Sequence, residues 1–233
     1  MKTILVTGAN RGLGFEACKQ LALDGHKIIM TGRDEAKLKQ AAAKLSGNII
    51  PLKMDVTADK EIENAAIWVK DHIGNIDVLI NNAGSVFDTF PFGANCENPL
   101  STGHNELRNT LELNLEGPYS VIKSFLPLLR KTQRTDIINV SSGMGSLHDM
   151  GTGAPAYRIS KAALNALTIF LATELAATKI YVNSLCPGWC STELGGQEAP
   201  RTPAEGIIGI RWIVNERPEL RGKFIRDKAI ISF

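Results

Sequence analysis

Two side chains with complementary acid–base properties stand four residues apart in a stretch of helical periodicity. Tyr157 and Lys161 would share one face of that helix, because residues i and i+4 are neighbours on a helix surface. A phenol has an unperturbed pKa of about 10 and exchanges protons poorly at neutral pH. A neighbouring ammonium lowers that pKa, which predicts a general acid–base pair. Without further motifs, a solvated surface pair would be the simpler interpretation.

A glycine-rich turn follows the first apolar run of the chain. Its glycines are spaced three-then-one, unlike the general dinucleotide-binding pattern G-x-G-x-x-G. A tight turn that opens a helix nevertheless aims backbone N–H groups at an anion such as a pyrophosphate. A plain turn between a strand and a helix is the alternative. The candidate cofactor residues here are Gly8, Asn10, Arg11, Gly12, Leu13 and Gly14.

The end of the second apolar run bears on the choice between NAD and NADP. An NAD site usually places an acidic residue there, which accepts a hydrogen bond from the ribose 2′-hydroxyl. Gly32 stands at this point instead, and Arg33 offers a guanidinium fork that suits a phosphate. Arg11 adds a second cation on the same side, so we predict NADP(H). Asp34 counts against this, since it would either cap the next helix or compete for the ribose.

Two further strand ends offer contacts to a nucleotide. Asp55 and Val56 follow the third apolar run, where a carboxylate and a backbone amide can meet an adenine edge. Asn82, Ala83 and Gly84 follow the fourth, and their small size lets the backbone approach a ligand. As isolated segments, neither would indicate a function.

Short runs rich in Ile, Val and Leu alternate with amphipathic stretches, which is typical of a parallel sheet buried on both faces. We therefore predict a Rossmann-type doubly wound α/β fold of about seven strands with helices on both faces. No linker or repeat divides the chain, so residues 1–233 are predicted to form one domain. The expected strands are 4–7, 27–31, 48–53, 76–80, 136–141, 180–185 and 223–226. The expected helices are 13–23, 35–45, 60–72, 106–116, 118–131, 157–177 and 203–215.

Two segments interrupt this rhythm after strands, at the edge where open α/β sheets bind ligands. Residues 85–103 are too long for an ordinary connection, and residues 188–202 are rich in Gly and polar residues. We predict that both form substrate walls, with solvated surface loops as the alternative. Met144 and Trp189 are the candidate substrate contacts. The apolar side chains that would suit a hydrophobic substrate, although each is more often simple core, are Phe87, Phe90, Met144, Leu147, Met150 and Trp189.

Composition excludes several classes of protein. Of 233 residues, 44% are hydrophobic and 21% charged, unlike a disordered or collagen-like chain. The 26 Lys and Arg against 24 Asp and Glu leave a net charge of +2, too balanced for a dedicated nucleic-acid binder. No apolar run reaches about 18 residues, so we expect no membrane span. The N-terminus also lacks the pattern of a signal peptide.

The cysteines do not form a metal-ligand pattern. Cys186 and Cys190 are the one close pair, and no second pair matches them. We therefore expect no metal site and no disulfide, and interpret the cysteines as buried thiols. Together with the missing export signal, this predicts a cytoplasmic protein.

The motifs occur in the order found in the short-chain dehydrogenase/reductase family. They are Thr7-Gly8-x3-Gly12-x-Gly14, Asn81-Asn82-Ala83-Gly84, Asn114, Ser142, Tyr157-x3-Lys161 and Pro187-Gly188. The chain resembles this family over almost its whole length. Within the family it is similar to the NADPH-dependent carbonyl reductases, including their C-terminal part, here residues 186–206.

The resemblance implies a role for each residue of the reacting centre. Tyr157 would donate a proton to a substrate carbonyl oxygen as a hydride arrives from the nicotinamide. Ser142, the second serine of its pair, would bind the same oxygen. Lys161 would also hold the ribose hydroxyls, and Asn114 would anchor a water relay from Lys161 to solvent. The positions that resemble the family's nicotinamide contacts are Pro187, Gly188 and Thr192.

The chain also departs from the family. Ser142 and Tyr157 stand 15 residues apart, slightly more than usual, and the extra residues would lie in 145–153 beside the substrate. The chain lacks the long insertion that some monomeric carbonyl reductases carry there. The face of the Tyr157 helix would then be free to pair with another subunit, so we predict a homodimer or homotetramer.

Together these features predict an NADPH-dependent oxidoreductase that reduces a small aldehyde, ketone or quinone to an alcohol, with neither nucleic acid nor membrane as a partner. Two alternatives are an NADP-linked alcohol dehydrogenase of a specific metabolite and a non-catalytic NADP(H)-binding regulator on the same scaffold. The full set Asn114, Ser142, Tyr157 and Lys161 favours catalysis, because a binding module does not need all four.

Overall fold

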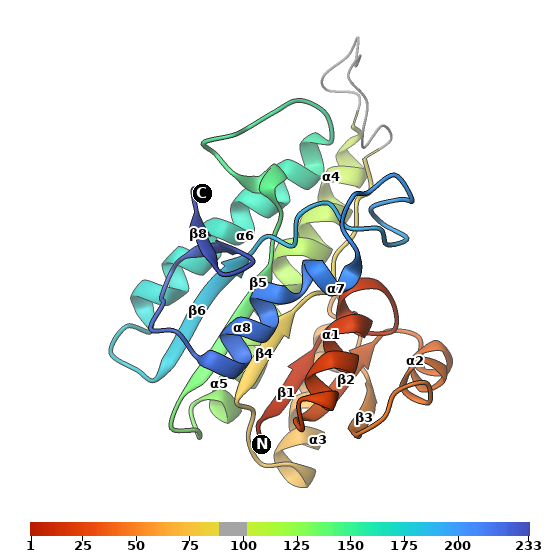
Figure 1. Ribbon diagram of the computed structural model, residues 1–233, viewed down its shortest axis with the longest axis vertical. Coiled ribbons are helices and arrows are strands. Elements are labelled where there is room, and N and C mark those ends of the chain that lie inside the picture. Colours follow the sequence, from red (N-terminus) through yellow and green to blue (C-terminus); the bar gives the residue numbers. More distant parts are fainter. Residues whose placement is uncertain (89–101) are drawn as a thin grey trace.

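A single sheet runs through the computed structural model, which describes residues 1–88 and 102–233. In these ranges the strand order is β3-β2-β1-β4-β5-β6-β7-β8 (Figure 1). Strands β1 to β7 are parallel, and β8 runs antiparallel to β7. The strands are β1 (Thr3–Val6), β2 (Lys27–Gly32), β3 (Asn48–Lys53), β4 (Val78–Asn81), β5 (Thr135–Val140), β6 (Ile180–Leu185), β7 (Phe224–Arg226) and β8 (Ala229–Ile231).

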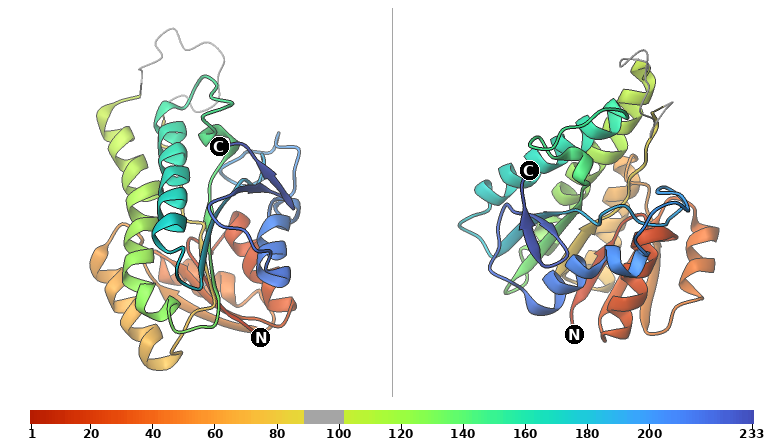
Figure 2. Two further views of the ribbon diagram at one scale, coloured as in Figure 1. Left: turned by 90° about the vertical axis from the view of Figure 1, so that its left-hand side faces the viewer. Right: turned by 45° about the horizontal axis from the view of Figure 1, so that its top comes forward.

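Helices cover both faces of this sheet (Figure 2). Side chains of α1, α2 and α8 pack on one face, and those of α3, α5 and α6 on the other. A π-helical segment, η1, joins α4 to α5. The helical elements are α1 (Gly12–Leu23), α2 (Glu35–Ala42), α3 (Asp59–His72), α4 (His104–Leu111), η1 (Glu112–Glu116), α5 (Gly117–Leu129), the 3-10 turn η2 (Gly143–Gly145), α6 (Pro155–Glu174), α7 (Pro203–Gly206) and α8 (Ile208–Glu216).

The central strands are apolar on both faces because both faces are covered. Leu5, Leu79, Ile137 and Val182 stand in register across β1, β4, β5 and β6, and all four are fully buried against the layer of α3, α5 and α6. Burial of such a side chain contributes about 1.5–3 kcal/mol. The predicted doubly wound α/β fold is confirmed. One domain over residues 1–233 stays a prediction, and the single sheet supports it.

The order of the strands fixes where a ligand can bind. β1 and β4 are neighbours, although β2 and β3 lie between them in the sequence. From this pair the chain winds outward in opposite directions, so the loops after β1 and β4 diverge. A crevice is left at the carboxyl edge of the sheet, where ligands of open α/β folds bind.

The C-terminal segment forms a strand that the sequence analysis did not predict. β8 pairs with β7, so the sheet has eight strands rather than about seven. Beyond β8, the ring of Phe233 stacks on Phe224 at 5.4 Å between centroids. The carbonyl of Phe233 accepts a hydrogen bond of 3.0 Å from the backbone N–H of His148. The segment therefore holds the loop that follows Ser142.

Two helices differ from their predicted form. The helix expected over 106–116 ends at Leu111 and passes into η1. The helix expected over 203–215 is broken at Ile207, between α7 and α8. Gly206 precedes the break, and a Cβ there would stand only 2.5 Å from Cys190 Sγ. Close packing thus requires glycine, a poor helix former, at the point where the helix breaks.

Candidate active site

A cavity of about 820 Å³ opens at the carboxyl edge of the sheet. It holds most of the site residues predicted from the sequence. Gly14 and Asn114 do not line the cavity and instead contact residues around it. The predicted residues that line the cavity are Gly8, Asn10, Arg11, Gly12, Leu13, Arg33, Asp55, Val56, Asn82, Ala83, Gly84, Ser142, Met144, Tyr157, Lys161, Pro187, Gly188, Trp189 and Thr192.

The glycine-rich turn is held directly against the end of β4. Gly8 has a φ of +62°, and a Cβ there would lie 2.8 Å from Ala83 Cα. Asn82 donates its side-chain N–H to the carbonyls of Thr7 at 2.9 Å and Gly8 at 3.1 Å. A Cβ on Gly14 would collide with the same Asn82 amide. These contacts bring the start of α1 to the edge of the cavity.

The ribose end of the cavity carries the two predicted arginines. Arg33 lines it, and none of the ion pairs among the described residues involves Arg33. Arg11 forms an ion pair with Glu193, which connects the glycine-rich turn to the loop after β6. Asp34 caps α2 by accepting from the N–H of Lys37 at 3.0 Å and does not line the cavity. The structure therefore favours the capping interpretation of Asp34.

The reacting centre lies where α6 passes the end of β5. Tyr157 and Lys161 are both buried and both line the cavity. Lys161 Nζ donates to the carbonyl of Val140 at 2.9 Å and stands 5.6 Å from the centroid of the Tyr157 ring. Ser142 follows β5, and its hydroxyl accepts from the N–H of Met144 at 3.2 Å. Ser142, Tyr157 and Lys161 thus meet at one place.

The acid–base state differs from the expected one. Burial raises the pKa of Tyr157 to about 12, and the Ser142 hydroxyl opposes this shift only in part. Burial also lowers the pKa of Lys161 to about 8. The net lowering of the phenol pKa that was expected from the neighbouring ammonium is not found in this structure, because burial sets the direction of the shift. Tyr157 is consequently a protonated phenol at neutral pH.

Asn114 lies at the centre of η1, fully buried. Its side-chain oxygen accepts from the N–H of Ser85 at 2.9 Å, and its side-chain N–H₂ donates to the Ser85 carbonyl and to Ser160 Oγ. A Cβ on Gly84 would stand 3.1 Å from Asn114 Oδ1 and 3.4 Å from Lys161 Nζ. Glycine at 84 lets both polar groups approach the same strand end, beside a π-helical turn of the kind often found at functional sites.

Asp88 is a buried residue of the site that the sequence analysis missed. Its carboxylate accepts from the backbone N–H groups of Ala156 at 2.9 Å and Tyr157 at 3.0 Å. It also accepts from the Thr102 hydroxyl at 2.8 Å. The N-cap residue of α6, Ala154, has no side chain that can cap, so Asp88 supplies the cap from a distant loop. The sequence around α6 carries no signal for this contact.

The substrate end of the cavity is apolar with one cation. Phe87, Trp189 and Leu194 line it together with Met144. Arg226, at the end of β7, lines it as well and was not predicted.

Two of the predicted apolar wall residues do not line this cavity. Leu147 is 71% exposed and Met150 44% exposed, and neither lines the cavity. The segment 145–153, expected beside the substrate, contributes no residue to the lining of this cavity. Arg158 donates hydrogen bonds to the carbonyls of Thr152 and Gly153 in this segment. Phe90 lies outside the described residues.

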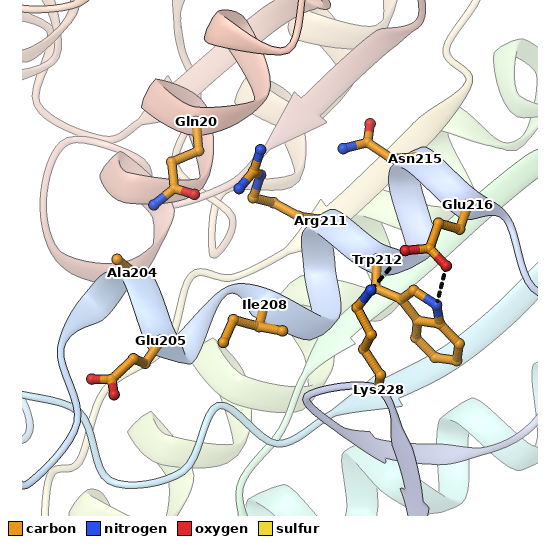
Figure 3. A pocket seen from close by; sticks show the side chains of 9 residues that line it. All are labelled: Gln20, Ala204, Glu205, Ile208, Arg211, Trp212, Asn215, Glu216 and Lys228. Atoms are coloured by element: carbon orange, nitrogen blue, oxygen red, sulfur yellow. Dashed lines mark hydrogen bonds and ion pairs between the residues drawn. The ribbon is translucent and has the colours of Figure 1, made fainter.

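A second cavity, of about 450 Å³, lies between α1, α7, α8 and the β7–β8 turn (Figure 3). Its polar groups are engaged with one another: Lys228 and Trp212 both reach Glu216, at 2.7 and 2.9 Å. Arg211 is paired with Asp24. With its charges neutralised internally, this cavity offers less to a ligand than the first.

The described residues show few other functional features. Within residues 1–88 and 102–233, no group of three His, Cys, Asp or Glu side chains could hold a metal ion. The helices of the same ranges include none with the length and hydropathy to cross a bilayer. Cys18, Cys186 and Cys190 are free and buried, while Cys96 lies outside these ranges.

Known proteins share the sequence pattern and the fold of this chain. The family model for short chain dehydrogenases matches residues 2–202. The short-chain dehydrogenase anuI of Penicillium roqueforti is 32% identical over 250 residues, which cover 99% of this chain and 96% of that protein. The NADPH-bound carbonyl reductase from chicken fatty liver is 27% identical with a TM-score of 0.86, covering 100% of this chain and 99% of the other. Carbonyl reductase Sniffer of D. melanogaster is 30% identical with a TM-score of 0.86, covering 100% of both chains.

The fold is a Rossmann-like α/β sheet with a crevice at its switch point, where such sheets bind ligands. The chain belongs to the short-chain dehydrogenase family, in which it resembles the carbonyl reductases. The resemblance inferred from the sequence motifs is thereby confirmed.

Proposed function

We propose that the protein is an NADPH-dependent reductase of aldehydes, ketones or quinones. The observation that carries this proposal is the meeting of Ser142, Tyr157 and Lys161 in the cavity that also contains the glycine-rich turn. A carbonyl group placed there would be in reach of a proton donor and of a nucleotide. The resemblance to an NADPH-bound carbonyl reductase supports the same reaction class.

The cavity fits a nicotinamide dinucleotide. At Gly8 and Gly14 a Cβ would collide with the Asn82–Ala83 segment, so only glycine permits this cradle. Arg33 suits the 2′-phosphate of NADP, and Asp55 and Val56 suit the adenine. Across the cavity, Pro187, Gly188 and Thr192 would lie against the nicotinamide. Gly12 supports this placement, since a Cβ there would be 3.6 Å from Thr192 Cγ2.

The residues of the chain then perform the acid–base part of the reaction. A bound nicotinamide supplies the hydride that the carbonyl carbon receives. Tyr157 donates its phenolic proton to the carbonyl oxygen, and Ser142 orients that oxygen through a hydrogen bond. The Lys161 ammonium stabilises the phenolate that remains and binds the ribose hydroxyls. Asn114 anchors the water relay through which the proton is replaced.

The protonated state of Tyr157 is compatible with reduction. Burial raises its pKa to about 12, so the phenol carries the proton that reduction would deliver to the substrate oxygen. A non-catalytic regulator does not need Ser142, Tyr157 and Lys161 to converge.

We further propose a cytoplasmic location, in keeping with the free thiols of the three described cysteines.

Replacement of the acid tests the mechanism. Tyr157→Phe removes the proton donor but keeps the ring, so NADPH oxidation with an aldehyde panel is expected to fall at least about 100-fold. NADPH binding, followed by fluorescence titration, is expected to stay within about threefold. Retained turnover in this variant would refute the assigned role of Tyr157.

Replacement of Arg33 tests the choice of cofactor. Arg33→Ala removes a guanidinium–phosphate contact, so kcat/KM for NADPH is expected to fall about 10- to 100-fold, with little change for NADH. Arg130→Ala, at the exposed C-cap that follows α5, controls for the change in net charge. An equal loss with both cofactors, or a wild-type preference for NADH, would contradict the assignment.

A further inference from the structure

Arg226 is a cation at the substrate end of the cavity that the proposed reaction does not use. It is the last residue of β7, which runs parallel to β6, so it emerges at the same carboxyl edge as the reacting centre. Its guanidinium Nη2 lies 3.1 Å from Cys186 Sγ. A Cβ on Gly143 would stand 2.9 Å from the same nitrogen. The guanidinium is therefore seated beside the residue that directly follows Ser142.

The charges of the cavity leave Arg226 without a carboxylate. Its lining contains two acidic residues, Asp55 and Glu193. Glu193 is paired with Arg11, and Asp55 accepts from the N–H and hydroxyl of Thr57 at the adenine end. No ion pair among the described residues involves Arg226.

Among the described residues, five arginines have a carboxylate partner, whereas Arg226, like Arg33, has none. Arg201 is paired with Asp227, the neighbour of Arg226 in the sequence, and Arg211 with Asp24. Arg226 instead meets a thiol sulfur, which is a weak acceptor and occupies one of its five N–H groups. A guanidinium so placed in a cavity can receive a planar anion with two parallel hydrogen bonds.

We propose that Arg226 recognises a carboxylate on the substrate, so that the preferred substrates are aldehydes or ketones that also carry a carboxylate group. This inference rests on the proposed reductase function. The carboxylate would bind beside Gly143 while the reducible carbonyl faces Ser142 and Tyr157. Phe87, Met144 and Trp189 would contact the carbon skeleton between the two groups.

The position of Arg226 separates this role from binding of the cofactor phosphates. The phosphate-binding features, the glycine-rich turn and Arg33, follow β1 and β2. Arg226 is the last residue of β7, which lies five strands from β2 in the order of the sheet, and it contacts Cys186 after β6. The charge on Arg226 is thus directed to the substrate side.

Turnover of matched acids and esters tests the proposal. The probes are the ortho, meta and para carboxybenzaldehydes and their methyl esters, with NADPH saturating. In the wild type, at least one acid is expected to exceed its ester about tenfold in kcat/KM. In Arg226→Gln this acid-to-ester ratio is expected to fall about 10- to 100-fold, the effect of a lost charged hydrogen bond. Arg226→Lys is expected to be intermediate, and Arg130→Gln is the control in which the ratio stays as in the wild type.

A binding measurement separates this inference from the proposed function. The corresponding hydroxymethylbenzoates and their methyl esters are titrated by calorimetry into the protein saturated with NADP⁺. If the wild type binds an acid more tightly than its ester and Arg226→Gln loses this difference, the carboxylate site is supported. If no aldehyde is turned over in the same experiments, that absence of turnover contradicts only the reductase function.

Three results would overturn the inference. The first is a wild-type preference for the esters in both measurements. The second is an acid-to-ester ratio that Arg226→Gln leaves unchanged. The third is an effect of Arg226→Gln confined to the KM for NADPH, which would assign the guanidinium to the cofactor.

Discussion

Burial sets the proton affinities of the two central side chains in opposite directions. Tyr157 and Lys161 are both held out of water, and burial disfavours whichever form is charged. The phenol is therefore kept neutral, with its pKa raised to about 12, while the ammonium becomes a stronger acid with a pKa of about 8. A neutral acid next to a lysine that titrates near neutrality is suited to delivering a proton and then recovering one.

These values predict a pH dependence for reduction. The reactive state contains the Tyr157 phenol and the Lys161 ammonium. Because the pKa of Lys161 is lowered to about 8, the ammonium is present below that pH and is lost above it, while Tyr157 stays protonated. With NADPH saturating, kcat/KM is expected to fall about tenfold per pH unit above about 8.

Lys161→Arg provides the control for this assignment. Arginine stays protonated through this range, so the fall of kcat/KM at alkaline pH is expected to disappear. The absolute rate is expected to be lower, because the planar guanidinium of arginine differs in shape from the lysine ammonium. An alkaline limb at the same pH in Lys161→Arg would assign it to another group.

At the scale of elements, α6 is positioned by a loop that lies far away in the sequence. The helix begins behind Ala154, in the left-handed region with a φ of 47°, and has no local cap. Asp88 supplies the missing acceptor and places negative charge at the helix N-terminus, where the macrodipole favours it. One of the two N–H groups that Asp88 accepts from belongs to Tyr157. The cap therefore holds the backbone of the residue that we propose as the proton donor.

Asp88→Asn tests this positioning role. The amide keeps the shape but removes the charge and one acceptor oxygen, so the free energy of unfolding in urea is expected to fall by about 1–3 kcal/mol. We also expect kcat to fall more than KM rises, because Tyr157 loses its fixed position. Asp34→Asn, which alters the exposed cap of α2, is the matched control and is expected to leave kcat unchanged. Loss of stability with an unaltered kcat would limit Asp88 to a structural role.

At the scale of the whole molecule, the outer face of α6 is more apolar than a solvated helix requires. Ile159 and Phe170 lie three turns apart on it, 50% and 56% exposed. Tyr119 on the adjacent α5 is 49% exposed. Exposed apolar side chains that gather on one face are typical of interfaces. We propose that this face forms the interface of the homodimer or homotetramer predicted from the sequence.

Light scattering coupled to gel filtration at micromolar concentration tests the assembly. The wild type is expected to elute with at least twice the mass of the chain, and Phe170→Glu to elute with a smaller mass because a buried charge is costly. Ile67→Glu is the matched control, since Ile67 is also 56% exposed but lies on α3. A monomeric wild type, or an equal effect of both variants, would refute the interface.

The sequence alone determined the fold class and most of the residues that line the main cavity. Local patterns suffice to predict both. The alternation of apolar runs with amphipathic stretches predicts the parallel sheet. The glycine-rich turn and Arg33 follow strand ends, which a parallel sheet brings to one edge. Boundaries of β3 and β6 agree residue by residue with the prediction. The family follows from the same motifs.

Only the tertiary structure decided what depends on contacts between distant segments. Asp88 meets the start of α6 across 68 residues, and Arg226 meets Cys186 across 40. The pairing of β8 with β7 and the direction of the Tyr157 pKa shift also depend on tertiary packing, and the sequence did not predict them. Spacing in a sequence shows which groups can be neighbours along one element, but burial and long-range packing set how much solvent each group keeps. For Tyr157 the loss of solvent is the largest influence on the pKa, and it raises it.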